Sequence, residues 1–293
     1  MTVQGVIVKA LSGFYYVQTA ESVITCRARG KFRMDGSSPL VGDRVEVEPS
    51  GDGTGSVRSI LPRRNFFIRP AVANIDVMII MAANVNPVTD PFLIDRASAF
   101  AEHADCECII CINKCDLDPG DALYDIYSRT GYTVLRTSAV TGEGVDGLRR
   151  AISGKTAAFS GNSGVGKSSL LNCLGPGCRA QVGEVSERLG RGRHTTRHVE
   201  LFNVGGSCIA DTPGFASFDL AQMDPIKKDE LQYCFPEFRQ CIGSCRFDDC
   251  RHIREPGCAV LEAVRDGKIP KSRHDSYTRL YDVVSRFREW EQK

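Results

Sequence analysis

The stretch from residue 161 to 168 places the strongest constraint on how this chain folds. Its sequence, GNSGVGKS, fits the pattern G-x-x-x-x-G-K-[ST] and stands between an apolar run and a helix-forming segment. Glycines at these spacings let successive backbone N–H groups point at one phosphate, beside the N-terminus of a helix. The pattern predicts a nucleotide-binding loop in an α/β domain. The residues expected to bind the nucleotide here are Gly161, Asn162, Ser163, Gly164, Val165, Gly166, Lys167, Ser168 and Ser169.

Two side chains of this loop are expected to contact the phosphates and the metal ion. Lys167 is expected to reach the β- and γ-phosphates and is counted among the catalytic residues, and the Ser168 hydroxyl is expected to hold Mg²⁺. The motif by itself does not separate an ATPase, a small-molecule kinase and a GTPase. Recognition of the base must decide between these classes.

A second motif, N-K-C-D at residues 113–116, predicts recognition of guanine. It follows an apolar run at 108–112 and therefore stands where a parallel strand ends, the edge at which α/β proteins bind ligands. A carboxylate at Asp116 can accept from both N1–H and the 2-amino group of guanine, which adenine does not offer together. We expect Asn113 to brace the loop, the Lys114 stem to cover the ring, and Ser138-Ala139 to offer backbone N–H groups to the guanine carbonyl.

Residues downstream of the phosphate loop predict a magnesium-dependent switch. Asp211 begins the sequence D-T-P-G after a short apolar run, and we expect it to bind Mg²⁺ through water while Gly214 senses the γ-phosphate. The glycine-rich and basic segment 189–197 contains Thr195 and Thr196, either of which could supply a further Mg²⁺ ligand in the triphosphate state. The order of the motifs leaves the choice between the two threonines open.

The residue that activates water is not evident from these motifs. Phe215 stands where many GTPases carry a glutamine, and a phenylalanine side chain cannot hydrogen-bond a water molecule. We therefore expect slow turnover of the isolated protein. His194 is the candidate catalytic group, and Arg191 and Arg193 are alternatives for stabilising charge.

A cluster of cysteines near the C-terminus predicts a structural zinc site. Cys245, Cys250, His252 and Cys258 form the spacing C-x4-C-x-H-x5-C, and Cys241 is a competing ligand. Three thiolates and one imidazole fill a tetrahedral Zn²⁺ shell, which leaves no position for a water nucleophile. The basic side chains around the cluster either contact RNA phosphates or form a solvated face. They are Arg246, Arg251, Arg254, Lys268, Lys271 and Arg273.

The rest of the sequence predicts a multidomain chain with three parts. Residues 1–67 alternate short apolar and polar runs with glycine-rich turns, which fits a small OB-like β-barrel, a fold often used to bind RNA. An SH3-like barrel is the alternative, because the sequence does not determine the order of the strands. Residues 68–220 alternate strands and helices typical of a mainly parallel α/β domain, and residues 221–293 form a zinc-binding, mostly helical domain. The expected strands are 76–83, 107–112, 132–137, 156–160 and 207–210, and the expected helices are 92–104, 121–130, 144–152 and 167–174.

Composition argues against a membrane or secreted protein and is compatible with a nucleic-acid partner. No apolar run approaches the ~20 residues that span a bilayer, and the N-terminus lacks the features of a signal peptide. We therefore expect a cytoplasmic protein with no membrane partner, in which the 13 cysteines are not a disulfide framework. Lys and Arg exceed Asp and Glu in residues 1–70, which is compatible with a nucleic-acid partner.

The order of these motifs resembles one particular family. The guanine motif, Ser-Ala, the phosphate loop, the threonine segment and D-x-x-G follow one another in a rotated order, which implies a circularly permuted GTPase domain. With a barrel before it and a Cys/His cluster after it, the chain resembles the ribosome small-subunit biogenesis GTPase A family. The resemblance implies GTP and GDP, Mg²⁺ and one structural Zn²⁺ as cofactors, and the small ribosomal subunit with its rRNA as partner.

The sequence therefore predicts a monomeric GTPase that hydrolyses GTP to GDP and phosphate. The resemblance implies that it acts late in maturation of the small ribosomal subunit, with turnover stimulated by that subunit. Two alternatives belong to other classes. One is an RNA-binding module in which the nucleotide is only a structural ligand, and the other is a P-loop kinase acting on a small molecule.

Overall fold

A computed structural model of the 293-residue chain describes residues 2–28, 32, 38–68, 70–175, 199–211 and 226–286. They fall into two compact units, one comprising residues 1–77, 149–159 and 168–215, the other residues 78–148, 160–167 and 216–293. The three-part division at residues 67 and 220 stays a prediction. None of the described helices is long and apolar enough to cross a membrane.

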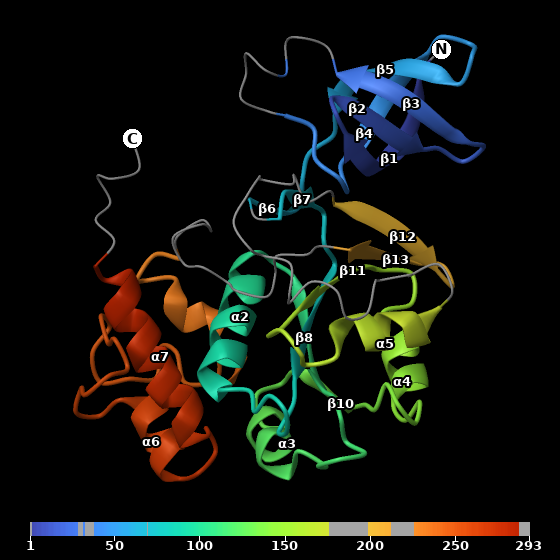
Figure 1. Cartoon of the computed structure of the whole chain (residues 1–293). Helices are drawn as coiled ribbons and strands as arrows, with labels where there is room; N and C mark the ends of the chain where they lie inside the picture. The colour runs from blue at the N-terminus through green and yellow to red at the C-terminus, as the bar shows by residue number, and fades with distance from the viewer. Residues whose placement is uncertain are drawn as a thin grey trace, which may run out of the picture. The chain divides into compact units, whose positions relative to one another are not determined.

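The first unit opens with a closed five-stranded barrel (Figure 1). Its strands follow the order β1-β2-β3-β5-β4, and β4 pairs back to β1, so that each strand has two neighbours within the barrel. The β3–β5 pair is parallel and the other pairs are antiparallel. This Greek-key closure is that of an OB-type barrel, as expected. The strands are β1 (Val3–Leu11), β2 (Phe14–Gln18), β3 (Val23–Ala28), β4 (Arg44–Pro49) and β5 (Thr54–Ile60).

The barrel forms because buried apolar residues alternate with more exposed residues along its strands. Ile7, Val17, Cys26, Val45 and Val57 are fully buried at their centre, while their sequence neighbours lie toward solvent. Period-two alternation of this kind places one face of each strand in a core. A two-stranded sheet of β6 (Phe66–Phe67) and β7 (Val72–Ala73) follows the barrel.

The first unit also contains a three-stranded part of the α/β domain. β11 (Thr156–Ser160) pairs in parallel with β13 (Ser207–Asp211), and β12 (Glu200–Val204) pairs with β13 as an antiparallel hairpin. Strand β12 was not predicted, although the Gly-Gly pair at 205–206 that joins it to β13 is a known hairpin signal, and both glycines have positive φ. Within the same unit, Lys9 of β1 faces Glu200 of β12 and forms an ion pair of 2.8 Å.

The second unit contains the strands whose ends carry the guanine motif. β10 (Thr133–Arg136) pairs in parallel with β9 (Glu107–Ile112), and β8 (Val77–Ala82) lies on the other side of β9. All six residues of β8 and five of the six in β9 are buried, which is typical of parallel strands covered on both faces. The helices associated with the α/β domain are α2 (Pro91–His103), α3 (Asp121–Tyr127), α4 (Val145–Ala151) and α5 (Lys167–Leu174).

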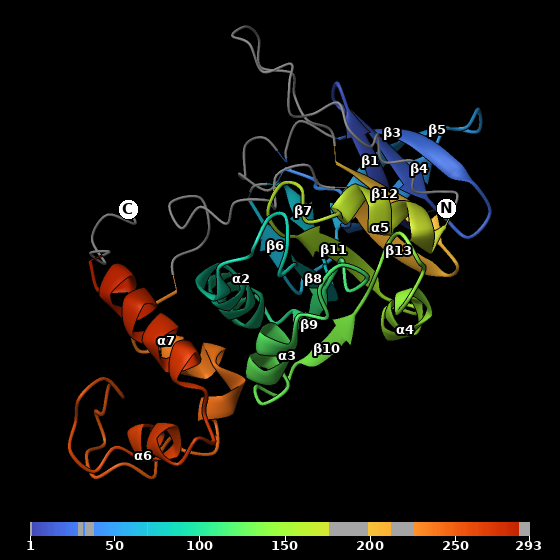
Figure 2. The ribbon, with the colours of Figure 1, turned by 60° about the horizontal axis from the view of Figure 1, so that its bottom comes forward.

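The C-terminal elements are the 3-10 helices η2 (Leu231–Cys234) and η3 (Pro236–Phe238), α6 (Ala259–Arg265) and α7 (Lys271–Val284). Of these, η2 and α7 pack on helix α2 (Figure 2). Tyr277, Leu280, Tyr281 and Val284 of α7 are all buried and form its apolar face.

The expectation for Arg273 was wrong. Its side chain is fully buried, so it neither contacts RNA nor belongs to a solvated face. It forms ion pairs with Asp95 of α2 at 2.8 Å and with Glu237 of η3 at 2.6 Å, and its guanidinium lies over the ring of Phe235. A buried guanidinium must be paired to offset its lost hydration. The other five basic residues of that group are exposed.

Candidate nucleotide site and metal centre

The candidate nucleotide site in the second unit is built from loops that follow β8, β9 and β10, together with residues 160–167. The register of β9 and β10 pairs Ile112 with Arg136, so that Asn113 and Thr137 leave the two strands side by side. This is the carboxyl edge of parallel strands, where α/β proteins bind ligands.

Close packing explains two glycines of the phosphate loop. Gly166 has φ +100°, and a Cβ there would collide with the Asn113 side-chain nitrogen. Gly161 has φ +140°, and a Cβ there would come within 2.5 Å of the Met81 carbonyl oxygen. Only glycine combines this backbone conformation with such close approach. The sequence pattern therefore reflects packing inside the protein as well as access for phosphate.

The side chain of the phosphate-loop lysine bonds to backbone carbonyl groups of the same loop. The Lys167 Nζ donates to the carbonyl oxygens of Gly161 and Asn162, the latter at 2.7 Å. Burial lowers the pKa of the Lys167 ammonium. An anionic phosphate would favour the charged form of this group, so a bound nucleotide would raise that pKa again.

Asn113 joins the base-recognition loop to the phosphate loop. Its side chain is 2% exposed, donates to the Val165 carbonyl oxygen at 2.9 Å and accepts from the Thr137 hydroxyl at 3.1 Å. A buried amide whose donor and acceptor are both satisfied has a defined orientation. Asn113 thus fixes the spacing between the two motifs.

Asp116 is exposed and is oriented by Ser138. The Ser138 hydroxyl donates to the Asp116 carboxylate at 2.5 Å and accepts from the N–H groups of Val140 and Thr141 at 3.2 and 3.1 Å. The Ser138 N–H donates to the Glu143 carbonyl oxygen, so the hydroxyl, rather than this N–H, links Ser138 to the base-recognition motif. The adjoining residue Ala139 lies in the same turn.

The structure describes only some of the remaining predicted site residues. Ser168 and Ser169 lie in the first turn of α5, as a phosphate-loop helix requires, and Asp211 is the last residue of β13. Other predictions lie outside the described residues. They are Arg191, Arg193, His194, Thr195, Thr196, Gly214 and Phe215.

Sequence reasoning missed four residues that contact the base-recognition loop. Thr137 bonds to Asn113, Asn84 donates to Asp118, and the Asn86 carbonyl oxygen accepts from the Lys114 ammonium. Thr137 directly follows β10 and Asn84 lies two residues after β8. Polar residues at the ends of parallel strands are a usable signal. Asp118 carries no such signal, because only the tertiary fold brings it to Asn84.

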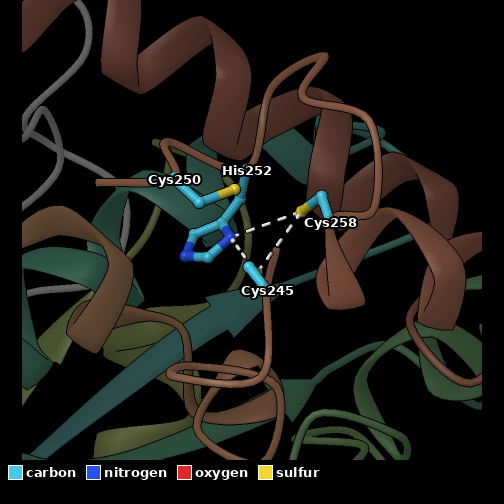
Figure 3. Close-up of side chains that lie close together, drawn as sticks. All are labelled: Cys245, Cys250, His252 and Cys258. Atoms are coloured by element: carbon cyan, nitrogen blue, oxygen red, sulfur yellow. Dashed lines mark hydrogen bonds between the residues drawn. The ribbon is translucent and has the colours of Figure 1, made fainter. Parts of the chain in front are cut away.

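The four predicted metal ligands converge in the second unit (Figure 3). Their ligand atoms lie within 4.8 Å of one another, and the two sulfur atoms of Cys245 and Cys258 are 3.9 Å apart. The His252 Nδ1 lies 3.5 Å from the Cys245 Sγ and 3.4 Å from the Cys258 Sγ. Cys241 does not belong to the cluster.

These separations fit a tetrahedral zinc ion. With Zn–S of about 2.3 Å and Zn–N of about 2.0–2.1 Å, the edges of the tetrahedron are about 3.8 Å between sulfurs and about 3.6 Å between sulfur and nitrogen. Burial raises the pKa of the Cys258 thiol to about 12 and lowers that of His252. Zn²⁺ would bind the thiolates and the neutral imidazole, so binding releases protons.

Gln232 orients the histidine ligand and was not anticipated from the sequence. Its Oε1 lies 2.9 Å from the His252 Nε2, and its Nε2 donates to the Asp229 carbonyl oxygen at 3.1 Å. The amide therefore presents its oxygen to the imidazole, which fixes the proton on Nε2 and leaves Nδ1 for the metal. No local sequence pattern connects positions 232 and 252.

We expect Gln232→Ala to weaken zinc binding about 10- to 100-fold, the usual cost of removing a partner of a metal-ligating histidine. Competition with a chromogenic chelator measures this affinity. Gln232→Glu keeps an acceptor oxygen and should bind zinc at least as tightly as the unmodified protein. Gln240→Ala, at an exposed position of the same segment, is the matched control. Equal affinity in the Gln232→Ala and Gln240→Ala variants would contradict the assigned role.

The phosphate loop after β11, and a guanine motif that precedes it in the chain, define a circularly permuted P-loop GTPase domain. The RsgA GTPase family model matches residues 60–221, and the RsgA N-terminal domain model matches residues 4–57. The chain therefore belongs to the RsgA GTPase family, whose members hydrolyse GTP with Mg²⁺.

Similar proteins cover nearly the whole chain. A protein of Caldanaerobacter subterraneus subsp. tengcongensis, named small ribosomal subunit biogenesis GTPase RsgA, is 45% identical over 286 residues, which are 96% of each chain. The crystal structure of YjeQ from Thermotoga maritima is 35% identical, with a TM-score of 0.84 over 98% of this chain and 100% of that one. The structure of YloQ, described as a circularly permuted GTPase, is 37% identical, with a TM-score of 0.81 over 97% and 96%.

Proposed function

We propose that this GTPase binds the small ribosomal subunit and hydrolyses GTP there during late maturation of the subunit. The observation that carries the proposal is the joined pair of loops, in which Asn113 ties the guanine motif to the phosphate loop and Ser138 aims Asp116. The ribosomal partner is supported by the name of relatives that match over nearly their full length. Such a partner implies action in the cytoplasm.

In the proposed mechanism each predicted residue has a separate role. Asp116 accepts from the guanine edge, the Lys114 stem covers the ring, and Lys167 exchanges its two carbonyl acceptors for phosphate oxygens. Ser168, Asp211 (through water) and one of Thr195 or Thr196 would hold Mg²⁺, and Gly214 would sense the γ-phosphate. Removal of that phosphate by hydrolysis would release the threonine and Gly214, and affinity for the particle would fall.

His194 is the group we propose to assist attack by water, in place of the missing glutamine at Phe215. Docking on the subunit would complete the geometry, as when a catalytic group is supplied or ordered by a partner. We also propose that the chain acts as a monomer in three domains, 1–67, 68–220 and 221–293. The barrel and the exposed basic residues near the zinc site are the surfaces offered to rRNA.

The Cys/His cluster is proposed to hold one structural zinc ion. Its four protein ligands complete the shell, so the ion supplies folding energy and no hydrolytic chemistry. Membership of a GTPase family does not favour the two alternative functions, the RNA-binding module with a structural nucleotide and the small-molecule kinase.

The proposal predicts a preference for GTP and a response to subunits. Each hydrogen bond to a charged group is worth ~1.5–3 kcal/mol, so the Asp116 pair should favour GTP over ATP by at least ~100-fold in affinity. Phosphate release should rise at least ~10-fold when purified small ribosomal subunits are added, because a completed site can gain ~10³ or more. Lys167→Ala is the control without turnover. A preference for ATP, or turnover indifferent to subunits, would contradict the proposal.

A further inference from the structure

The loop between β8 and α2 is a closed and ordered element beside the guanine motif. The Ala83 N–H donates to the Thr89 hydroxyl at 3.0 Å, and the Thr89 N–H donates to the Ala83 carbonyl oxygen at 2.8 Å. Both residues are buried. Asp90 then caps α2 by accepting from the Phe92 N–H at 2.9 Å. The loop 84–88 is therefore anchored at both ends.

This loop is tied to the guanine motif on both sides of Asp116. On one side, the Asn86 carbonyl oxygen accepts from the Lys114 ammonium. On the other side, the Asn84 amide donates to the Asp118 Oδ1 at 3.0 Å. Asp116 lies in the middle of the turn 114–118, which the N–H groups of Leu117 and Asp118 close onto the Lys114 carbonyl oxygen.

Asp118 is a junction between the loop and the turn. The same Oδ1 that accepts from Asn84 accepts from the Gly120 N–H at 2.8 Å. Those two bonds, from Gly120 and from Asn84, lower the pKa of the Asp118 carboxyl. Asp118 therefore holds both the end of the turn and the start of α3 against the loop 84–88.

We propose that Asn84 and Asp118 are positioning residues for guanine discrimination, because their bond fixes the turn that aims the Asp116 carboxylate. The inference rests on the proposed recognition of guanine by Asp116. Guanine offers two donors to that carboxylate and hypoxanthine offers only one, so a misplaced carboxylate loses more with guanine. Loosening the turn should therefore narrow the preference for guanine over hypoxanthine.

Binding of fluorescent GDP and IDP to the full chain tests this inference. The unmodified protein should prefer GDP by ~10- to 100-fold, the value of one hydrogen bond to a charged group. Asn84→Ala and Asp118→Ala should each reduce the ratio of the two affinities at least threefold, and the double variant should reduce it no further than Asp118→Ala alone, since both changes break one bond.

Two controls separate positioning from general damage. Asp118→Asn keeps an acceptor oxygen for Asn84 and Gly120 and should retain the ratio within about twofold. Asn203→Ala changes an exposed asparagine whose amide oxygen accepts from Gly206 within its own hairpin, and this variant should leave the ratio unchanged.

The results separate the positioning role of Asn84 and Asp118 from the recognition of guanine by Asp116. Equal losses of GDP and IDP affinity in the Asn84→Ala variant, or an unchanged ratio, would overturn the positioning role while leaving guanine recognition intact. An unmodified protein that does not prefer GDP to IDP would overturn the proposed recognition of guanine itself.

Discussion

Removal of zinc is expected to unfold the stretch between η3 and α6, with the largest energetic effect of any change considered for this chain. Residues 239–258 are all described, and they contain turns but neither helix nor strand. A segment of this kind buries little apolar surface, and structural zinc supplies an apparent ~10–16 kcal/mol in small zinc domains. An ion bound by the cluster would also fix the start of α6, because Cys258 precedes the first helical residue and the Cys245 sulfur accepts from the Ala259 N–H.

Cys258→Ser should reproduce the effect of a chelator. Cys258 is buried and is one of the four cluster residues, and a serine hydroxyl is a poor substitute for a thiolate on zinc. Zinc content should fall from the proposed one ion per chain to near zero, and amide hydrogen exchange should become fast throughout residues 241–265. Because binding displaces protons from the thiols, the affinity of the intact site should rise with pH.

Cys241→Ser is the matched control for the zinc site. Cys241 belongs to the same segment but lies outside the cluster, so this variant should keep its ion and its slow exchange. Loss of zinc from Cys241→Ser, with retention in Cys258→Ser, would show that the ligand set is wrong.

Arg273→Met should lower the free energy of unfolding of the second unit by ~3–5 kcal/mol, the usual cost of removing one partner of a buried ion pair. The variant leaves two carboxylates, Asp95 and Glu237, buried without their cation. The Tyr127 hydroxyl donates to Asp95 at 2.7 Å, but neutral hydroxyl donors do not offset the lost charge. Hydrogen exchange in α2 and α7 would locate the loss.

Two comparisons test the assignment to the buried ion pair. Lys271→Met removes an exposed i,i+4 pair with Asp275 on the same helix and should change stability by at most ~0.5 kcal/mol. Replacing Arg273, Asp95 and Glu237 together by apolar residues of similar size should recover most of the stability lost by Arg273→Met. A single Arg273→Met variant as stable as Lys271→Met would contradict the interpretation.

The periodic parts of the chain followed from the sequence. The expected strand 107–112 and helix 167–174 have the same bounds in the structure, and helix 92–104 corresponds to α2 at Pro91–His103. These segments are long runs of one period with clear ends, such as Asp90 and Pro91 at the start of α2. The antiparallel strand β12 was missed, although the Gly205-Gly206 turn that follows it is a hairpin signal.

Part of the candidate site was likewise predictable from local sequence, and part was not. Local spacing sufficed for Gly161–Ser168, for Asn113–Asp116 and for the four metal ligands, since each set is constrained by the chemistry of one small ligand. The partners of these residues come from elsewhere in the chain. Asn113 bonds to a carbonyl oxygen 52 positions away, and Gln232 faces a histidine 20 positions away.

By itself, the sequence determined the α/β class, the rotated order of the motifs and the atoms available to phosphate, guanine and zinc. Only the tertiary structure decided which polar groups hold those atoms in place, and that the barrel strands close in OB order. It also decided that Arg273, which had the pattern of a surface cation, lies buried between Asp95 and Glu237. The reason is physical: a motif reports demands that a ligand makes locally, whereas burial and pairing depend on which distant segments pack together.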